Sequence, residues 1–440
     1  MNYQRLFLLC CILIAAFLPQ SSHACTTFCL DTQDELVVGK NFDWHTGDAL
    51  IVVNKRNVTK TAYLYPDWTG EQPVSWISKY GSVTFNPWGQ EFPFSGMNEA
   101  GLVVSAMGLS ATTYPAPDSR PAISAMQWIQ YQLDTAATVA DVIASDTVLR
   151  ISNSDPWTLH FFICDSLGNC ASIEFLDGVL VYHTQETMPV KVLTNNIYST
   201  DLEDWENEEI TVPDVYSSAQ RFCTATEMLE DYDPETSGPA TDYTFTVLSN
   251  LTWAAPTQWS IAFDAPHRRI SFHTLDNANI RYVDINSFDF SCLTPVRVLD
   301  IQEDLSGNVA GDFIDYTYEL NRTLIGKSKP RKDAPDELLD ALAEYPETTV
   351  CADACELNIK HKKIKSDKLS KSRKRVLHIT GDEGFDIFGQ IDLGPITLRK
   401  KFSNAKKNSL KIKVLVPAGL RPGTVPIWVG SCFGEIEVLP

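Results

Sequence analysis

From residue 25 the chain reads Cys25-Thr26-Thr27-Phe28-Cys29, and ten residues later it reads Gly39-Lys40-Asn41-Phe42-Asp43-Trp44. The apolar and β-branched residues of Thr26–Leu30 and Glu35–Asn41 predict two strands, and the polar residues of Asp31–Asp34 predict the turn that joins them. A hairpin of this kind places a cysteine, a lysine and an aspartate in one short region. The same segment therefore bears on both the fold and the chemistry of the protein.

The 24 residues before this hairpin have the features of a secretory signal peptide. Arg5 precedes the apolar run Leu6–Leu18, and a small polar stretch ends at Ala24. This order is typical of a cleaved signal, and the run is too short to span a bilayer, which takes about 20 residues. Ser22 and Ala24 supply the small residues of a cleavage site. Cleavage there would export the protein, periplasmic or secreted, with Cys25 as its first residue.

An N-terminal cysteine has three interpretations, which the cleavage site alone leaves open. It can be a lipoprotein acceptor, although that processing site usually has a leucine-like residue where Ser22 stands. It can be a disulfide cysteine near the start of the mature chain. It can also be a nucleophile that its own α-amine activates, because an α-amine with an ordinary pKa of about 7.7–8.0 accepts the thiol proton near neutral pH.

Three later segments change the balance between these interpretations. They are Gly96-Met97-Asn98-Glu99-Ala100-Gly101-Leu102, Val192-Leu193-Thr194-Asn195 and Ser218-Ala219-Gln220-Arg221-Phe222. With the hairpin at residues 25–44, their order resembles the choloylglycine hydrolase family. That family contains conjugated bile acid hydrolases, penicillin V acylases and other linear-amide C–N hydrolases with an N-terminal nucleophile. The resemblance covers about residues 25–325.

The resemblance implies a role for each of five residues. Cys25 would attack an amide carbonyl to give an oxyanion and then a thioester that water hydrolyses, with its own α-amine as the base. Asp43 would accept a hydrogen bond from that amine, and Asn195 would donate one to the oxyanion. Arg221 would balance the charge beside the thiol. Lys40 stands where bile acid hydrolases usually have arginine, and it keeps the charge without the planar fork.

These residues also have ordinary structural explanations. Asp43 and Asn195 each follow a predicted strand and could be turn residues, Arg221 could be a solvated helix residue, and Lys40 could lie on the outward face of its strand. The family often has a second oxyanion side chain at the position of Gly108, which has none. The departures at Lys40 and Gly108 weaken bile salt specificity more than they weaken amide hydrolysis.

The elements expected in residues 25–325 form an α+β pattern in which blocks of strands alternate with blocks of helices. The resemblance implies the four-layer αββα sandwich of N-terminal-nucleophile hydrolases. Helices are expected at Ala122–Leu133, Val139–Ala144, Tyr216–Tyr232 and Phe245–Leu251. Further strands are expected at Ala49–Asn54, Val103–Leu109, Leu159–Cys164, Ala171–Phe175, Val179–His183, Ile261–Phe263 and Ile270–Thr274.

A second domain is expected at the C-terminal end. Residues 326–349 are predicted to form a linker that contains a short helix, Asp336–Tyr345. Residues 356–440 hold 17 basic and 8 acidic residues, whereas residues 1–355 hold 19 basic and 48 acidic ones. This reversal of charge marks a domain boundary. Residues 350–440 contain apolar runs separated by turns, so we expect a small basic all-β domain, with an immunoglobulin-like sandwich as the favoured form.

Composition limits the partners of the protein. The 440 residues are 44% hydrophobic, which excludes a mainly disordered chain, and the net charge of −20 argues against a nucleic-acid binder. The basic cluster Lys360–Arg375 could contact an anionic envelope surface, although docking on the acidic main domain, or no role at all, is the more ordinary explanation. The oligomeric state is left open, a homo-oligomer included.

Cysteine and histidine spacing predicts disulfides and neither a metal nor a cofactor. Besides Cys10 and Cys11 in the signal and Cys25, eight cysteines remain, an even number that suits disulfides in an exported chain. Cys164 with Cys170 could close a hairpin, and Cys351 with Cys355 a short loop. The eight histidines form no H-E-x-x-H motif and the chain has no C-x-x-C pair, so a zinc site is not expected.

Taken together, these observations predict an exported, cofactor-free cysteine amidohydrolase. Its substrate would be a small-molecule acyl amide, such as penicillin V, a conjugated bile acid, or an N-acyl amino acid or homoserine lactone. One alternative keeps the fold and makes it an N-acylethanolamine or ceramide-type hydrolase, or an acyltransferase. Another alternative is a secreted binding protein on an inactive hydrolase scaffold.

Overall fold

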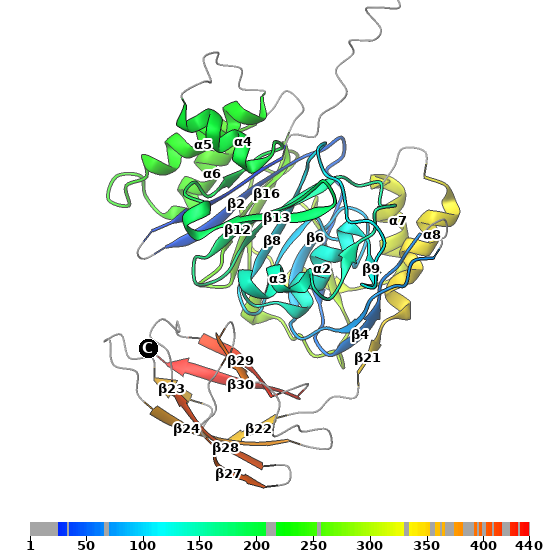
Figure 1. Cartoon of the computed structure of the whole chain (residues 1–440), viewed down its shortest axis with the longest axis vertical. Helices are drawn as coiled ribbons and strands as arrows, with labels where there is room; N and C mark the ends of the chain where they lie inside the picture. Colours follow the sequence, from blue (N-terminus) through cyan, green and yellow to red (C-terminus); the bar gives the residue numbers. More distant parts are fainter. Residues whose placement is uncertain are drawn as a thin grey trace, which may run out of the picture.

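The structure is a computed structural model of the whole chain (Figure 1). The expected signal peptide, residues 1–24, lies outside the described residues, as does most of the basic cluster Lys360–Arg375. Within the described residues, no helix is both long and apolar enough to cross a membrane. The structure describes residues 25–32, 35–65, 70–207, 217–252, 257–329, 334–352, 357–360, 363–365, 374–381, 391–393, 396–397, 402–406, 409–415, 423–429 and 432–439.

The first of two large sheets has seven strands in the order β14-β1-β2-β15-β16-β17-β19. The first hairpin, β1 and β2, lies inside this sheet, and every residue of β2 is buried. Its long strands pair antiparallel, and short turns join β1 to β2 and β15 to β16. The strands are β1 (Thr26–Asp31), β2 (Leu36–Asp43), β14 (Val192–Leu193), β15 (Thr257–Asp264), β16 (Arg269–Thr274), β17 (Arg281–Asp284) and β19 (Gly307–Asn308).

The second large sheet has nine strands in the order β13-β12-β11-β8-β7-β6-β3-β18-β20. Small sheets, β21-β4-β5 and β9-β10, lie beside it. The strands of the nine-stranded sheet are β3 (Leu50–Asn54), β6 (Ser82–Asn86), β7 (Ser95–Asn98), β8 (Val103–Gly108), β11 (Leu159–Cys164), β12 (Cys170–Leu176), β13 (Val179–Thr184), β18 (Arg297–Asp300) and β20 (Ile314–Asp315); the small sheets contain β4 (Val58–Thr61), β5 (Ser75–Ile77), β9 (Ala122–Ile123), β10 (Arg150–Ile151) and β21 (Val350–Cys351).

The two large sheets face each other across an aromatic core. Phe42 of β2 stacks on Trp259 at 4.0 Å between ring centroids and meets Phe94, which precedes β7, edge-on at 5.2 Å. Phe85 of β6 contacts Phe263 of β15 in the same way, at 6.1 Å. Such aromatic pairs add to the stabilisation that burial of apolar surface provides. Any polar group placed between the sheets must therefore find its partners inside the protein.

Helices cover the outer faces of both sheets (Figure 1). α5 and α6 pack on the seven-stranded sheet, and α2 packs on β7 and β8 of the other sheet. The close approach of α6 to β2 depends on Gly39, since a Cβ there would lie 2.8 Å from Thr244 Cγ2. The helices are α2 (Ala125–Thr135), α3 (Val139–Ser145), α4 (Tyr198–Glu206), α5 (Ser218–Glu230), α6 (Ala240–Asn250), α7 (Tyr318–Ser328) and α8 (Asp336–Glu344).

The expected α+β class is confirmed, and several local expectations differ from the structure. Helix α7 was not expected, and α6 begins at Ala240, not at Phe245. Ala122–Ile123 forms a short strand, not the start of a helix, because Ser124 caps α2 by accepting from the Gln127 N–H. Helix α4 was not expected at all. Only Tyr198 and Asp201 of its nine residues are buried, so its sequence has little apolar periodicity.

The region expected to be a linker, residues 326–349, contributes to the core of the larger domain. Helix α8 forms where the sequence predicted one, and its Leu339 and Leu342 are buried in the main hydrophobic cluster. Strand β21 then pairs with β4, and Cys351 forms a disulfide with Cys292. The suggested Cys351–Cys355 bond is therefore wrong, because the sheet pairing carries Cys351 to a distant loop. The suggested Cys164–Cys170 bond is confirmed.

The C-terminal residues form two sheets of their own. The four-stranded sheet has the order β22-β24-β28-β27, and the five-stranded sheet has the order β23-β30-β29-β25-β26. The two face each other at Gly434, where a Cβ would lie 2.8 Å from the Cβ of Leu357. The strands are β22 (Leu357–Lys360), β23 (Lys363–Lys365), β24 (Lys374–Gly381), β25 (Ile391–Leu393), β26 (Ile396–Thr397), β27 (Phe402–Lys406), β28 (Ser409–Leu415), β29 (Gly423–Val429) and β30 (Cys432–Leu439).

The Cys292–Cys351 disulfide gives a stability prediction. It closes a loop of 59 residues, so replacing both cysteines by alanine should lower the free energy of unfolding by about 4 kcal/mol. Denaturant unfolding followed by tryptophan fluorescence would measure the change. Cys292→Ala alone and Cys351→Ala alone should each lose as much as the pair, because each breaks the same bond. Additive losses from the two single variants would contradict the prediction.

Candidate active site

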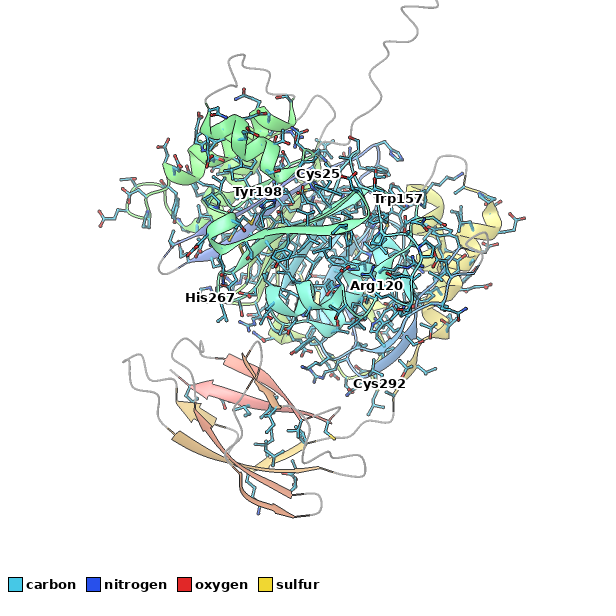
Figure 2. All side chains as sticks on the ribbon, in the orientation of Figure 1. Cys25, Arg120, Trp157, Tyr198, His267 and Cys292 are labelled. Atoms are coloured by element: carbon cyan, nitrogen blue, oxygen red, sulfur yellow. A yellow bond between two sulfur atoms is a disulfide. The ribbon has the colours of Figure 1, made fainter. Side chains whose placement is uncertain are left out.

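The candidate site lies where β1 begins, and its neighbours bring the other residues to that point. Cys25 immediately precedes β1 and lies at the upper end of the paired sheets in Figure 2. The register Thr27↔Leu193 between β1 and β14, continued by two residues, places Asn195 across from Cys25. On the other side, β2 pairs with β1 and ends at Asp43. The nucleophile candidate thus sits between the ends of two neighbouring strands.

Arg221 connects these strand ends. It is carried by α5, whose first turn is capped by the Ser217 side chain, and only 3% of its surface is exposed. One guanidinium nitrogen donates to the Cys25 carbonyl and to the Thr26 hydroxyl, both at 2.6 Å, and the other donates to Asn195 Oδ1 at 2.9 Å. Arg221 is therefore not a solvated helix residue. It holds the start of β1 and the expected oxyanion residue in one arrangement.

Asn195 is oriented through both ends of its amide. While Oδ1 accepts from Arg221, Nδ2 donates to the Gly108 carbonyl at 2.8 Å. The backbone N–H of Asn195 donates to the Ser218 hydroxyl at 2.7 Å. An amide nitrogen carries two hydrogens, so one remains for a substrate oxygen. Gly108, where a second oxyanion side chain was sought, provides instead the acceptor that directs Asn195.

Asp43 is buried with one of its oxygens unused. Oδ1 accepts from the Thr257 hydroxyl at 2.5 Å, whereas the buried Oδ2 accepts no hydrogen bond from any described residue. Burial raises the pKa of Asp43 to about 6, although Thr257, Arg221 and Lys40 act against that rise. A buried carboxylate oxygen without a donor is costly, so this oxygen calls for a cationic or N–H partner.

Lys40 lies between the two sheets and not on an outward face. It is fully buried, donates to the Ala106 carbonyl at 2.7 Å and sits 5.3 Å from the centre of the Phe94 ring. Its charge also interacts with the Cys25 thiol. Burial lowers the pKa of Lys40, and the charges of Cys25 and Asp43 oppose that change. The lysine therefore faces the thiol directly.

Burial and the neighbouring groups shift the pKa of the Cys25 thiol in opposite directions. Burial is the largest and raises its pKa, and the charge of Asp43 acts in the same direction. Lys40, the Asp43 backbone N–H and Arg221 lower the pKa by stabilising the thiolate. The buried thiol thus depends on its cationic neighbours and on an added base to become a nucleophile.

A cluster of packed aromatic rings begins at Phe94, beside Lys40. Phe94 meets Trp88 edge-on at 5.6 Å, and Trp88 lies 5.5 Å from Trp44 and 4.8 Å from Trp157. Trp44 follows Asp43 directly, so these rings also reach the end of the β1–β2 hairpin. The sequence motifs did not single out Trp88 or Trp157, because these residues lie in loops far from the hairpin in the chain.

The structure brings all five expected site residues together, and it adds partners that sequence reasoning missed. Thr257 and Ser218 bond to Asp43 and to the Asn195 backbone, and the carbonyls of Gly108 and Ala106 bind Asn195 and Lys40. Backbone carbonyls have no sequence signature. Ser218 begins the arginine segment and could have been noted as a first-turn residue, whereas Thr257 gave no signal.

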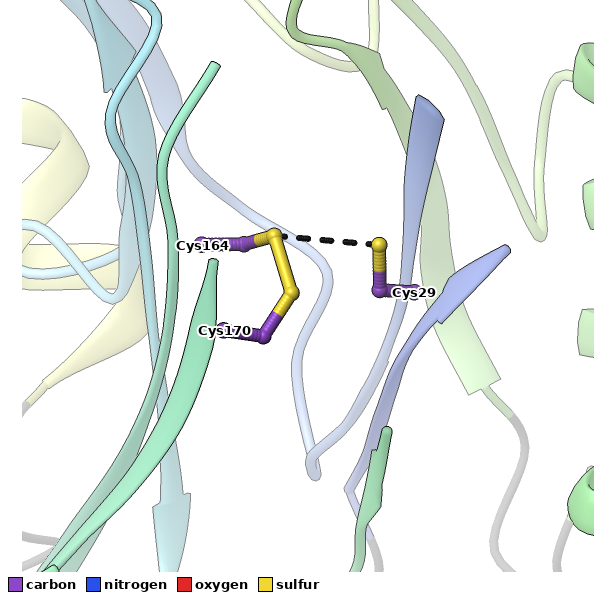
Figure 3. A group of neighbouring side chains, drawn as sticks. All are labelled: Cys29, Cys164 and Cys170. Atoms are coloured by element: carbon purple, nitrogen blue, oxygen red, sulfur yellow. Dashed lines mark hydrogen bonds between the residues drawn. A yellow bond between two sulfur atoms is a disulfide. The ribbon is translucent and has the colours of Figure 1, made fainter. Parts of the chain in front are cut away.

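One group of sulfur atoms has the proximity that a metal site would need. Cys29 lies 3.7 Å from Cys164, which is bonded to Cys170, and all three sulfur atoms lie within 4.8 Å of one another (Figure 3). Metals bind thiolates, and here two of the sulfurs form a disulfide. Only the Cys29 thiol is therefore left as a ligand. Cys29 also lines a cavity of about 360 Å³ with Lys191 and Tyr232.

Part of the chain is similar in sequence to a known family of hydrolases. Residues 25–229 match the sequence model of the linear amide C–N hydrolases, choloylglycine hydrolase family. The penicillin V acylase of Pectobacterium atrosepticum is 24% identical over a match that covers 50% of this chain and 70% of that protein.

Solved structures share the fold. Penicillin V acylase from Agrobacterium tumefaciens has a TM-score of 0.57 at 24% identity, over 67% of this chain and 98% of that one. A variant of the conjugated bile acid hydrolase from Clostridium perfringens has a TM-score of 0.53 at 16% identity, over 64% and 98%.

The fold and the family match define a hydrolase that acts on carbon–nitrogen bonds in linear amides. The similarity to the choloylglycine hydrolase family extends over residues 25–229, and the order of the four motifs predicted this similarity.

The buried Asp43–Thr257 contact yields a prediction that requires no substrate. In the intact chain, before any cleavage after Ala24, we expect the Asp43 carboxyl to titrate near pH 6, ionised above that pH and protonated below it. Thr257→Val should move the midpoint higher, because the hydroxyl stabilises the charged form. Carbon-13 NMR of the labelled carboxyl would follow both titrations. Thr226→Val is the control, since that hydroxyl donates to the Phe222 carbonyl. A midpoint near the ordinary 3.8 would contradict the prediction.

Proposed function

We propose that the protein is a cysteine amidohydrolase whose nucleophile and base are the thiol and the α-amine of Cys25. The single observation that carries this proposal is the buried Asp43 Oδ2, which accepts nothing from the described residues. Cleavage after Ala24 would create an ammonium group on Cys25, a residue whose thiol is already close enough to Asp43 for the carboxylate charge to raise its pKa. That ammonium is the donor which the unused oxygen lacks.

The proposed reaction follows from the contacts of the site. The α-amine takes the thiol proton, and the thiolate attacks the carbonyl carbon of the amide. The free hydrogen of Asn195 Nδ2 stabilises the resulting oxyanion. The amine returns the proton to the leaving nitrogen, which departs to leave a thioester on Cys25. Water, with the amine again accepting a proton, then hydrolyses the thioester and frees the acid.

Lys40 has a supporting role in this reaction. Its ammonium group donates to the Ala106 carbonyl and its charge lowers the pKa of the Cys25 thiol, so it stabilises the thiolate once the α-amine has removed the proton. A lysine offers a point charge and no bidentate fork, which suits a single sulfur atom. Arg221 contributes its charge, which lowers the pKa of the Cys25 thiol, and it fixes geometry by donating to the Cys25 carbonyl, the Thr26 hydroxyl and Asn195 Oδ1.

We propose that the acyl part of the substrate is aromatic or otherwise flat and apolar. Phe94 contacts Lys40, and the rings of Trp88, Trp44 and Trp157 continue from it. Aromatic surfaces favour stacking with flat apolar groups. Penicillin V, whose acyl group is a phenoxyacetyl group, has this chemistry, and the similar proteins include penicillin V acylases. A panel of acyl amides, with bile acid conjugates and N-acyl homoserine lactones as competitors, would rank the classes by kcat/KM.

Export and the C-terminal module belong to the same proposal. The proposed base exists only after a signal peptide has been removed, so activity requires export to the periplasm or the medium.

The two facing sheets of the C-terminal module support an immunoglobulin-like sandwich. If Lys360–Arg375 contacts an anionic envelope surface, charge reversal there should release the protein from envelope fractions at moderate salt; an unchanged distribution would exclude that contact.

The mature N-terminus tests the proposal directly. Intact mass and N-terminal sequencing of the exported protein should identify Cys25 as the first residue. Protein expressed with residues 1–24 retained should be inactive, and removal of those residues should restore activity. Cys25→Ser should process and fold normally but turn over at least a hundredfold more slowly, because a hydroxyl is the weaker nucleophile. A different first residue in the active enzyme would overturn the mechanism.

The proposed oxyanion contact makes a separate prediction. Asn195→Ala should lower kcat by about a hundredfold or more, the usual effect of losing one oxyanion donor, with a smaller change in KM. Single-turnover measurement of thioester formation would show whether the chemical step is affected. Asn196→Ala is the matched control, since Asn196 donates to Asp201 and not towards Cys25. Near-normal turnover by Asn195→Ala would mean that other donors hold the oxyanion.

A further inference from the structure

A histidine and a glutamate are buried together next to the candidate site, and none of the steps above uses them. His160 lies on β11 and Glu174 on β12, and both are completely buried. The register Phe161↔Ile173, continued by one residue, places them directly opposite each other. Nδ1 of His160 lies 3.2 Å from Oε1 of Glu174. Burial of two polar residues costs free energy unless both are hydrogen-bonded.

The second ring nitrogen identifies what the pair holds. Nε2 of His160 lies 2.8 Å from the carbonyl oxygen of Thr194, the residue that precedes Asn195. A carbonyl oxygen only accepts, so Nε2 must carry a hydrogen and donate it. Because Nδ1 faces a carboxyl oxygen, a further proton lies between His160 and Glu174. With one proton on each side, the imidazole ring cannot rotate without losing both contacts.

Glu174 fixes the same segment from its other side. Its Oε1 also accepts from the backbone N–H of Tyr198, the first residue of α4, at 3.0 Å. A carboxylate at the N-terminus of a helix is stabilised by the free N–H groups there. The pair therefore holds the chain at Thr194 and at Tyr198, on both sides of Asn195.

The Thr194 carbonyl needs such a partner because of where β14 ends. The ladder between β14 and β1 includes only Val192 and Leu193, so the next carbonyl lies beyond the paired residues. The Thr194 side chain is occupied elsewhere, as its hydroxyl donates to Asp201 at 2.7 Å. The direction of the peptide group between Thr194 and Asn195 is thus set by His160 on one side and by Ser218 on the other.

We propose that His160 and Glu174 form a positioning pair that holds the Thr194 carbonyl and thereby directs the Asn195 amide towards the reacting carbonyl. The inference rests on the proposed oxyanion role of Asn195. The pair touches neither the thiol nor the substrate. It acts by limiting the conformations of the backbone that carries the donor, and small displacements of a donor are known to cost much of its effect.

Two substitutions at His160 test the hydrogen bond to the Thr194 carbonyl, because one retains a donor and the other does not. The Nε2 of a glutamine side chain can reach the position of the ring Nε2, so His160→Gln should still donate to Thr194, whereas His160→Leu cannot. We expect His160→Leu to lower kcat at least tenfold with KM changed less than threefold, and His160→Gln to recover most of the loss. At the partner position, Glu174→Gln should retain activity and Glu174→Leu should not.

Controls separate positioning from a general loss of stability. Phe161→Leu removes ring contacts with Trp128 on the helix-facing side of β11, and the ring centroids there are 4.3 Å apart. It should lower the unfolding midpoint with little change in kcat. Each variant would be assayed well below its own unfolding midpoint. A loss of kcat that follows the unfolding midpoint across all five variants would overturn the proposal.

A double substitution decides whether His160 acts through Asn195. If it does, His160→Leu combined with Asn195→Ala should turn over no more slowly than Asn195→Ala alone. If the double variant shows the product of the two single-variant losses in kcat, His160 acts by another route and the inference is overturned. Normal turnover by Asn195→Ala would overturn the proposed oxyanion role itself. A normal His160→Leu beside a slow Asn195→Ala would overturn the positioning pair alone.

Discussion

Burial of charge between two apolar sheets is the constraint on which the candidate site depends. Lys40, Asp43 and Arg221 are nearly inaccessible to water, so each must be compensated by neighbours inside the protein. The compensation is shared, because Arg221 bonds to the Cys25 backbone and to Asn195 while Lys40 faces the thiol. One oxygen of Asp43 and one hydrogen of Asn195 have no partner among the described residues, and the proposed reaction uses both.

The two sheets and the helix α5 place the groups of the candidate site around Cys25. β1 and β2 lie inside the seven-stranded sheet, where aromatic packing against the nine-stranded sheet excludes water. The opposite sheet supplies acceptors across the interface, the carbonyls of Ala106 and Gly108 on β8. The outer helix α5 supplies Arg221 and Ser218. The two sheets and the outer helix layer thus each contribute groups that the nucleophile cannot obtain from its own strand.

Sequence reasoning found the hairpin, most strands and the five site residues, because these follow from local patterns and from motifs within a few residues. It missed α4, which has little apolar periodicity, and it paired Cys351 with its nearest neighbour in sequence and not with Cys292. It also treated 326–349 as a linker, although α8 packs in the core. In each case the deciding contact is a tertiary one, which propensity and spacing do not report.

The sequence by itself determined that a cysteine stands at a cleavage site, that a lysine and an aspartate follow on the next strand, and that later motifs place an asparagine and an arginine in order. The tertiary structure alone decided which atoms of those residues are used and which are free. Asn195 meets Gly108 across 87 residues, Thr257 meets Asp43 across 214, and His160 meets Thr194 across 34. Hydrogen bonds of such separation depend on how sheets pack, and packing is a property of the whole chain.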